Sequence, residues 1–490
     1  MQPIPLFGSG LNAYSPYVTR QRRLNCFFEI KPDGDKSNLI VRGTPGLVAW
    51  IALPDAPIRG WHVVSNILYV VAGLTLWQVA TNGTMTALGS LDIASTGNVR
   101  MADNGVQLLI VDGLAGYIYT IVTGTYAQSA LNAAGSFGKI TDANFPNGTT
   151  SVCFLDGRLI VAKPSTRQFY VSESYDGTAW TNVFSLPTFG TKDNNSDLLV
   201  SVSSLNGILI LFGQQTVEFW QNVGTSPLPF GRVSGATRNM GIAAQYSTAF
   251  IDDVQLFLGQ SLYGGNVEVT MQQGFNLQRV STDDLDNIIR SFAVWQDAIG
   301  FGYILDGHKM YQLTFPSAER SFLFDATTNF WYELQSGLAL QARHLANFGI
   351  TFNTFTYVSD TTTGTIYRLD ANVYTDNGEP IKRQIASRHI SQGGNRFGVD
   401  ELYLDMETGV GLQYGQGSDP QIVLQVSKDG GRTFGVERWR AMGKVGQYKS
   451  PRVMWNRLGA AQDFVFLWTM TEPVKFTVVG GAVKVRGQEK

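Results

Sequence analysis

The 490-residue sequence predicts an all-β protein made of a β-propeller of about seven blades and an additional C-terminal β-sandwich-like module. Short apolar runs of strand length recur at a spacing of roughly 40 to 55 residues, which is typical of propeller blades. Each run is followed by a turn with Gly, Asp or Asn and by a second strand that usually carries an aromatic residue. After Gln392 the repeat stops, and a separate antiparallel module is expected.

The apolar runs predict strands buried on both faces, as in a blade packed between two neighbours. The seven runs are residues 67–71, 107–111, 158–162, 208–212, 254–258, 299–304 and 355–359. The strands predicted to pair with them as hairpins are residues 76–79, 117–119, 168–171, 218–220, 267–269, 310–313 and 366–369. Six or eight blades, or an array of β-sandwiches with accidental spacing, are the alternatives.

Changes in this pattern place the boundaries of three parts. Residues 1–50 are expected to form an N-terminal arm and strand for an interface or for closure of the propeller, residues 51–391 the propeller, and residues 392–490 the C-terminal module. Strands are expected there at residues 401–407, 422–426, 437–440, 452–455, 464–470 and 474–479, and the Gly pairs 264–265 and 480–481 are interpreted as hairpin turns. A hydroxyl cap and acidic residues before apolar residues at helical spacing predict one short helix over residues 281–290.

The composition excludes some classes of function. Charged residues make up 16% of the chain, well below the roughly 25% usual for soluble proteins, which suits a particle-bound or extracellular protein. A net charge of −2 disfavours tight DNA binding but is compatible with weak contact to a moving duplex. No secretion signal and no membrane-spanning apolar stretch is recognised, so we expect synthesis in the cytoplasm. Cys26 and Cys153 are predicted to be reduced and buried.

The most specific local motif is the Asp-box-like turn, formed by Ser427, Asp429, Gly431, Thr433 and Phe434. It resembles the Asp-box hairpin of sialidase-type propellers, in which the carboxylate caps backbone donors and glycine supplies a positive φ. A shortened version occurs at residues 174–180. Turn stabilisation is the favoured interpretation of both.

No catalytic, cofactor-binding or metal site emerges from the remaining motifs, so the chain is predicted not to be an enzyme. The acidic groups at Asp252 and Asp253, and at Asp283, Asp284 and Asp286, are where carboxylate-based glycoside hydrolysis would be sought, but a turn and a helix start explain them better. The four histidines, His62, His308, His344 and His389, match no zinc motif. A carbohydrate-binding or sialidase-like glycan-hydrolysing propeller is the alternative function.

Two groups of basic residues are candidate contact sites. Arg20, Arg22 and Arg23 could face DNA or an acidic partner surface, although a solvated segment or an intersubunit ion pair is the favoured interpretation. Lys382, Arg383, Arg388 and Arg396 lie near the expected module boundary and are a candidate subunit interface.

Three stretches carry a resemblance to a known family: residues 39–47 (LIVRGTPGL), residues 206–220 followed by 240–243 (MGIA), and residues 285–292 (LDNIIRSF). On these the chain resembles the packaged-DNA stabilisation proteins, also called tail hub or nozzle proteins, of short-tailed phages of the lambdoid Salmonella type. Residues 427–430 and 475–478 add a weaker match.

The resemblance implies a structural virion protein with no cofactor. It implies a homo-hexameric ring below the portal and adaptor rings that surrounds the DNA exit channel, retains the packaged genome and makes only transient contact with exiting double-stranded DNA. A tail needle or plug and tailspikes or fibres would be further partners. The protein would be assembled in the host cytoplasm and reside in the virion tail.

Overall fold

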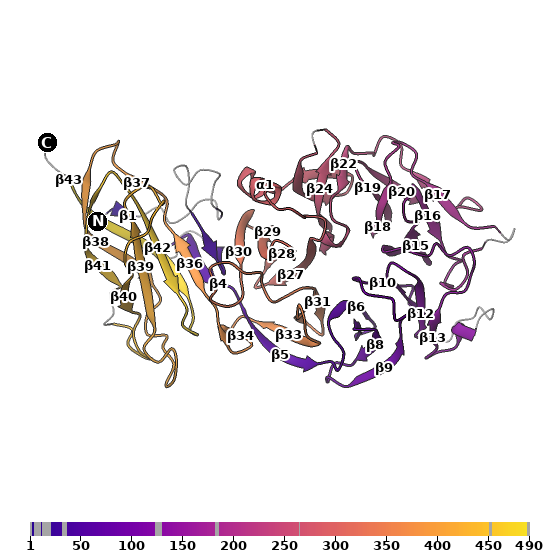
Figure 1. Cartoon of the computed structure of the whole chain (residues 1–490), viewed down its shortest axis with the longest axis horizontal. Coiled ribbons are helices and arrows are strands. Elements are labelled where there is room, and N and C mark those ends of the chain that lie inside the picture. The colour runs from indigo at the N-terminus through magenta and orange to yellow at the C-terminus, as the bar shows by residue number, and fades with distance from the viewer. Residues whose placement is uncertain are drawn as a thin grey trace.

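The computed structural model describes residues 2–3, 11, 21–31, 37–122, 130–181, 186–263, 265–449 and 453–487. Figure 1 shows a ring of small sheets at one end and two packed sheets at the other, joined near the first strands of the chain. Strands predominate, and the described residues contain one α-helix, α1 (Asp283–Arg290). No helix in this part of the chain has the length and hydrophobicity needed to cross a membrane.

Seven blades form the ring within the described residues, which confirms the predicted fold class. The first three are β6–β9 (Ile58–Val64, Ile67–Ala72, Thr75–Val79, Met85–Ser90), β10–β13 (Arg100–Asp103, Gln107–Val111, Gly116–Thr120, Phe137–Lys139) and β14–β17 (Val152–Leu155, Arg158–Ala162, Gln168–Val171, Phe189–Thr191). The fourth and fifth are β18–β21 (Leu199–Leu205, Ile208–Gly213, Val217–Asn222, Phe230–Arg232) and β22–β26 (Met240–Ile242, Ala249–Ile251, Val254–Ser261, Val267–Gln273, Asn276–Arg279). The last two are β27–β30 (Ile299–Leu305, His308–Phe315, Arg320–Asp325, Phe330–Leu334) and β31–β33 (Gly349–Phe352, Phe355–Ser359, Thr365–Asp370) with β5 (Gly46–Ala52).

Burial on both faces explains the apolar runs. In β11, Leu108 and Ile110 pack in a cluster with residues of the first blade, whereas Leu109 and Val111 pack in a cluster with residues of the third. Successive side chains of a strand point to opposite faces, and each face of a blade meets a neighbour, so both faces must be apolar. Six of the seven predicted runs are the second strand of their blade. The run at 299–304 is instead a first strand, β27 (IGFGYIL), which is more continuously apolar than the second strand of that blade, β28 (HKMYQLTF).

The ring is closed by a strand from the N-terminal part of the chain. β5 pairs antiparallel with β33, from Gly46 opposite Asp370 to Ala52 opposite Thr365, and so becomes the outer strand of the last blade. A side chain at position 46 would collide with the carbonyl oxygens of Val373 and Thr375, so only glycine fits there. Hydrogen bonds between segments over 300 residues apart therefore hold the circle shut.

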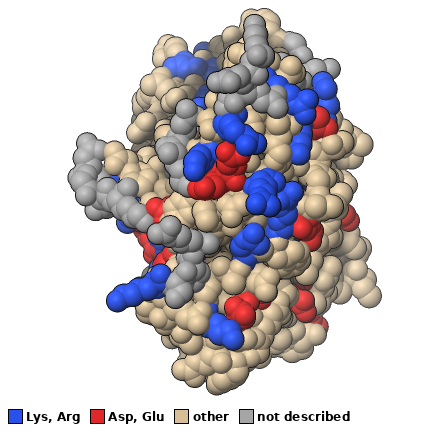
Figure 2. Space-filling model, turned by 90° about the vertical axis from the view of Figure 1, so that its left-hand side faces the viewer, with Lys and Arg blue, Asp and Glu red and all other residues tan. Residues whose placement is uncertain are grey.

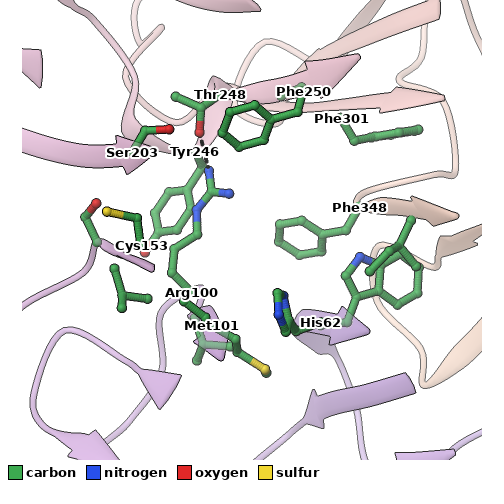
Figure 3. Close-up of a pocket in the computed structure, with 18 of the residues that line it drawn as sticks. His62, Arg100, Met101, Cys153, Ser203, Tyr246, Thr248, Phe250, Phe301 and Phe348 are labelled. Carbon is green, nitrogen blue, oxygen red and sulfur yellow. Dashed lines mark hydrogen bonds between the residues drawn. The ribbon is translucent and has the colours of Figure 1, made fainter. Parts of the chain in front are cut away.

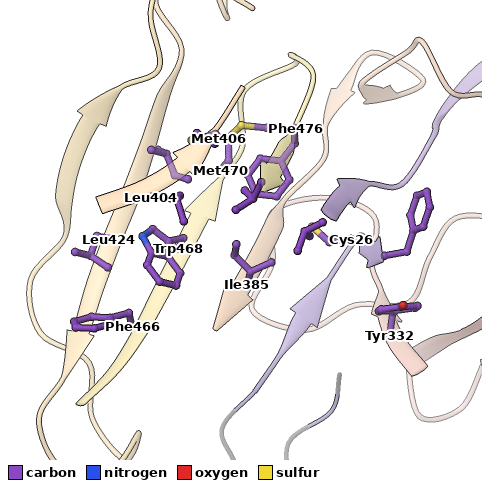
Figure 4. Packing of buried hydrophobic residues seen from close by; sticks show 14 of the residues in the cluster. Cys26, Tyr332, Ile385, Leu404, Met406, Leu424, Phe466, Trp468, Met470 and Phe476 are labelled. Carbon is purple, nitrogen blue, oxygen red and sulfur yellow. The ribbon is translucent and has the colours of Figure 1, made fainter. Parts of the chain in front are cut away.

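The second module is a β-sandwich that also takes up N-terminal strands. One sheet has the order β3 (Cys26–Ile30), β4 (Leu39–Gly43), β43 (Thr477–Gly487), β38 (Phe397–Met406) and β41 (Met454–Ala461), with β1 (Gln2–Pro3) paired to β43. The other contains β36 (Arg383–Ala386), β42 (Asp463–Met470), β39 (Gln421–Ser427) and β40 (Arg438–Ala441), with β37 (Ile390–Ser391) paired to β42. Leu404, Leu424, Phe466 and Trp468 fill the space between the sheets (Figure 4).

The two modules share a sheet and a core. β2 (Arg23–Leu24) pairs with β30 of the sixth blade on one side and with β36 of the sandwich on the other. Cys26 and Tyr332, near the blade, lie in the same apolar cluster as Ile385 and Trp468 (Figure 4). The segment expected as an arm at residues 1–50 thus contributes strands to the sandwich before β5 closes the ring.

Several local predictions can be compared with the structure. The helix is confirmed, and the Thr282 hydroxyl caps it by accepting from the Leu285 amide at 3.3 Å. Cys26 and Cys153 are free and buried, and burial raises the pKa of the Cys26 thiol to about 12. The turn predicted at residues 480–481 is wrong, because both glycines lie inside β43 where its register with β38 shifts. Of the pair 264–265, residue 264 lies outside the described residues.

Candidate functional surfaces

The Asp-box-like turn joins β39 to β40 and is held by its own hydrogen bonds. The Ser427 hydroxyl donates to the Asp429 carboxylate at 2.7 Å and accepts from the Gly431 amide at 2.8 Å. Asp429 also accepts from the Thr433 amide at 3.0 Å and from the Thr433 hydroxyl at 2.6 Å. These bonds from Ser427 and Thr433 hold the pKa of the Asp429 carboxyl well below its ordinary value. Gly431 has the positive φ, 82°, that the turn requires, and Phe434 lines a neighbouring hollow. The hydrogen bonds of the Asp429 carboxylate all lie within the turn, so this carboxylate stabilises the turn.

Asp176, Asp252, Asp283 and Asp286 also have local partners. In the shortened motif, Asp176 accepts from the Thr178 amide at 2.9 Å, and the buried Trp180 donates to the Gly177 carbonyl at 2.9 Å. Arg279 forms ion pairs with Asp283 and Asp286 of α1, at 2.5 Å and 2.6 Å. Asp252 sits in the turn before β24 with φ 50° and lies 2.8 Å from Lys309.

The N-terminal arginines lie at the junction of the two modules. Arg20 is outside the described residues. Arg22 donates to Glu333 at 2.9 Å and to Gln384 at 3.3 Å, so it joins the sixth blade to the sandwich. Arg23 is 1% exposed, with its guanidinium 3.9 Å from the centre of the Phe28 ring, and burial lowers its pKa to about 9. Arg22 is therefore paired and Arg23 is hidden within the subunit.

The second basic stretch is divided by the same junction. Arg383 is fully buried at the start of β36, and its side chain occupies the space that a Cβ at Gly43 would need. Lys382 donates to the Ala339 carbonyl at 3.4 Å. Arg388 and Arg396 are exposed on the sandwich and remain available for contacts.

A cavity of about 600 Å³ follows the axis of the propeller. Its lining comes from the first strand of every blade, including residues 60–62, 100–103, 152–154, 201–204, 249–250, 300–302 and 349–351. Arg100 donates to the Thr248 hydroxyl at 3.0 Å (Figure 3). It also donates to the Gln245 carbonyl at 3.1 Å. His62 lies 2.7 Å from Asp103; burial alone would raise the pKa of Asp103, but the interaction with His62 holds it below its ordinary value. A cavity of this size suits a small molecule and cannot admit a DNA duplex.

The histidines are distributed through both modules. His308 is 2.7 Å from Asp325, and His389 is 2.6 Å from Asp463. In the part of the chain that the structure describes, no group of three His, Cys, Asp or Glu side chains is placed to hold a metal ion.

Charge is distributed unequally between the modules. Residues 382–490 contain 16 Lys and Arg and 10 Asp and Glu, whereas residues 1–381 contain 21 and 29. The net charge of the whole chain is therefore close to zero because the positive charge of the sandwich is offset by the negative charge of the propeller. Figure 2 shows the sandwich end of the molecule, where Lys and Arg outnumber Asp and Glu.

A group of described cations that have no ion pair lies on and around β40 and β41, which form adjacent edges of the two sheets. Among the described residues, these side chains take part in no ion pair; they are Lys428, Arg432, Arg438, Arg440, Lys444, Lys449 and Arg457. Trp439 is 51% exposed and Tyr448 is 70% exposed among them. We call these nine residues the basic edge. Cations interleaved with exposed aromatic rings are typical of surfaces that contact nucleic acid.

Comparison with known proteins assigns the chain to a family. The family model described as "Bacteriophage P22 Gp10, beta-propeller" matches residues 2–374, and the model described as "Bacteriophage P22 Gp10, beta-sandwich" matches residues 382–486. The chain belongs to the bacteriophage P22 Gp10 family. The resemblance to the tail nozzle proteins is therefore confirmed, and this Gp10 relative is a structural component of a phage tail.

The other comparisons add nothing to this assignment. No curated protein matches the chain. Similar solved structures include a streptogramin B lyase (8% identity, TM-score 0.42, 67% of this chain and 98% of that chain). Another is the virginiamycin B lyase from Staphylococcus aureus (10% identity, TM-score 0.42, 66% of this chain and 98% of that chain). A third is the Neurospora crassa Pan2 WD40 domain (9% identity, TM-score 0.40, 67% of this chain and 95% of that chain). Similarities this distant say nothing about the function of the Gp10 relative.

Sequence reasoning missed the basic edge of the Gp10 relative. Its residues lie on β40, β41 and the turns around them, and none of these segments is strongly basic by itself. The net charge of each module, counted separately, was the signal that could have found it. The triplet Arg438, Trp439 and Arg440 puts two cations and an exposed ring on one short segment and was a second signal.

Proposed function

We propose that this chain is a non-enzymatic subunit of the tail nozzle of a short-tailed phage. The observation that carries the proposal is the match of both modules, in order, to the P22 Gp10 family. The Asp-box-like turn is the feature most similar to an enzyme motif, but its carboxylate, Asp429, is bonded to Ser427 and Thr433 of the same turn. The protein would be assembled in the host cytoplasm and act in the virion tail by forming contacts.

We further propose that six copies form a ring below the portal and adaptor rings. One chain cannot enclose DNA, because the cavity along its propeller axis is only about 600 Å³. A channel for a duplex must therefore lie between several copies, and repeated head-to-tail contacts close into such rings. The sheet shared by β30, β2 and β36 supports this role, because it fixes the modules of each subunit relative to each other.

The basic edge is the surface that we propose to face the exit channel and help retain the DNA. Its seven unpaired cations offer contacts to phosphate, and Trp439 and Tyr448 offer flat apolar surface. Each phosphate that a protein neutralises adds a salt-dependent increment of affinity. A few contacts per subunit would hold a resting duplex and still allow it to slide during ejection. The needle or plug and the tailspikes or fibres would bind other surfaces of the ring.

Assembly with the cognate adaptor ring tests this function. Mass photometry and negative-stain imaging of the full chain, with and without the adaptor ring, should show about six copies added to each ring. The same protein incubated with bacterial surface polysaccharide should release no reducing sugar. A protein that does not associate with the adaptor ring and cleaves the polysaccharide would replace the nozzle assignment with the glycan-hydrolysing alternative.

A further inference from the structure

A second cavity, of about 910 Å³, opens at one face of the propeller. Its lining comes from loops that precede the first strands of blades and from turns between second and third strands. Asn98 and Asn347 lie in loops that precede first strands, just before β10 and β31. Gln214 and Gln215 lie in a turn between a second and a third strand, β19 and β20. Tyr246 lines both this cavity and the axial one, so the two adjoin. We call the second cavity the amide basin.

Carboxamide side chains dominate the lining of the amide basin. They are Asn98, Gln214, Gln215, Gln245, Gln260, Gln296 and Asn347. A carboxamide carries two donor hydrogens and an acceptor oxygen in one plane. The oxygens of Gln245, Gln296 and Asn347 already accept from Thr150, Trp295 and Arg343, so these three offer chiefly their donors. The charged residues of the lining are a single cation, Arg343, and a single anion, Asp297, so the basin has no excess of either sign.

Arg343 and Asp297 are held in place but incompletely bonded. Arg343 donates through Nη2 to Asn347 at 2.7 Å, and Asp297 accepts the Ser317 amide at 2.7 Å. Within the described structure, Arg343 Nε and Asp297 Oδ1 are buried atoms without a hydrogen-bond partner. Burial lowers the pKa of Arg343, although the charge of Asp297 opposes this. Because these two atoms are closed to solvent, the guanidinium and the carboxylate can reach a ligand in the basin only through their other polar atoms.

We propose that the amide basin binds a saccharide that is neutral or weakly charged. Sugar hydroxyls are both donors and acceptors, and they match a surface of carboxamides with one further donor and acceptor. Phosphate or nucleic acid would require an excess of cations, which the basin lacks. Val200, Ile242, Ile299 and Pro316 supply apolar patches for the C–H faces of a sugar ring. The volume lies within the range of roughly 300 to 1,000 Å³ typical of sites for small ligands.

Saturation-transfer NMR with the full chain tests this site. The probes are glucose, galactose, mannose, rhamnose and N-acetylglucosamine, each at millimolar concentration, and an uncharged peptide rich in Ser and Gly. At least one sugar should receive saturation from the protein, and the peptide should not. Transfer to none of the sugars, or to the peptide alone, would overturn the proposal.

Two variants locate the binding. Gln215→Ala and Arg343→Gln should each weaken sugar binding, by about tenfold for Arg343→Gln because a hydrogen bond from a charged donor is lost. Gln221→Ala is the matched control, because Gln221 is an exposed amide on β20 of the same blade that does not line the basin. Equal binding by all three variants would contradict the assignment. The sugar-binding measurement does not require ring assembly. A negative sugar-binding result therefore leaves the nozzle function intact, and a failure to assemble rings does not affect the proposed sugar site.

Discussion

The Asn25 side chain hydrogen-bonds both backbone polar groups of Gln335: Nδ2 donates to the carbonyl at 2.8 Å, and Oδ1 accepts from the amide at 2.9 Å. Nδ2 also donates to the Lys382 carbonyl at 2.9 Å. Gln335 directly follows the last strand of the sixth blade, and Lys382 directly precedes the first strand of the sandwich sheet. One buried carboxamide thus joins segments that lie more than 300 residues away in the sequence.

Asn25→Ala should destabilise the protein by about 2–4 kcal/mol, because it leaves the buried polar groups of Gln335 without partners. Part of the effect comes from the backbone, since Asn25 has φ 53°, a conformation that Ala adopts poorly. Urea unfolding measures the loss. Asn25→Gly separates the two causes, because it removes the hydrogen bonds but tolerates the backbone. A wild-type unfolding curve for both variants would disprove the role of this side chain.

Glu333→Gln should cost about 3 kcal/mol of folding stability. The Glu333 side chain is 5% exposed and lies 2.9 Å from Arg22 and 3.1 Å from Arg320, so its neutralisation leaves two guanidinium groups without their anion. Thermal unfolding should show a clearly lower Tm. Glu437→Gln removes an exposed carboxylate from the sandwich and is the control that should unfold like wild type. Equal Tm values for the two variants would contradict a stabilising role for the ion pairs that Glu333 forms with Arg22 and Arg320.

The stability of the protein should fall below pH 6.5 partly because of His344. Burial lowers the pKa of His344, and the charge of Asp376 only partly opposes this. The unfolded state therefore binds the proton more tightly, so this contribution to stability is present above the ordinary His pKa of about 6.5 and is lost as the pH falls toward the lower folded value. His344→Gln should lose less Tm than wild type between pH 7 and pH 5. An identical loss would mean that other groups account for the decline.

The basic edge should bind duplex DNA weakly and in a salt-dependent manner. Replacing Arg438, Arg440 and Arg457 with Ser should lower the affinity and reduce the slope of log affinity against log salt by up to about three, since each phosphate that is no longer neutralised lowers the slope by about one. Fluorescence anisotropy with a short labelled duplex over a salt series measures both. Arg388→Ser with Arg396→Ser removes exposed cations elsewhere on the sandwich and should change little. If this control loses as much affinity, DNA binding is not specific to the basic edge.

Asp429→Ala should lower stability by about 1 kcal/mol, because the turn loses the acceptor for the Thr433 amide and hydroxyl. Since the folded pKa of Asp429 is lowered, its contribution is complete above the ordinary Asp pKa of about 3.9 and disappears as the pH falls through the lower folded value. Thermal unfolding at pH 7 and at pH 3 should show a smaller difference between variant and wild type at pH 3. A difference that grows at pH 3 would contradict this role.

The succession of apolar and polar residues predicted much of the fold, because it reflects which faces of each strand are buried. Leu108 and Leu109 are adjacent, point to opposite faces of β11 and pack against different blades, so a continuous apolar run was a reliable sign of a blade. The pattern could not number the strands within a blade. The first strand β27 (IGFGYIL) is more continuously apolar in sequence than the second strand β28 (HKMYQLTF), although β28 is the more buried of the two. The glycines at 480 and 481 were misassigned because a glycine pair inside a bulged strand has the same sequence as one in a turn.

The sequence by itself determined the repeat of blades, the capped helix at Thr282 and the turn around Asp429, because each depends on residues within a few positions of one another. The tertiary structure alone decided that Arg23 is buried, that Asn25 joins the modules, and that carboxamides from separate blades surround one basin. These relationships depend on which sheet edges meet when the ring closes and the sandwich forms. Such pairing is selected by the packing of the whole chain, and no short segment records it.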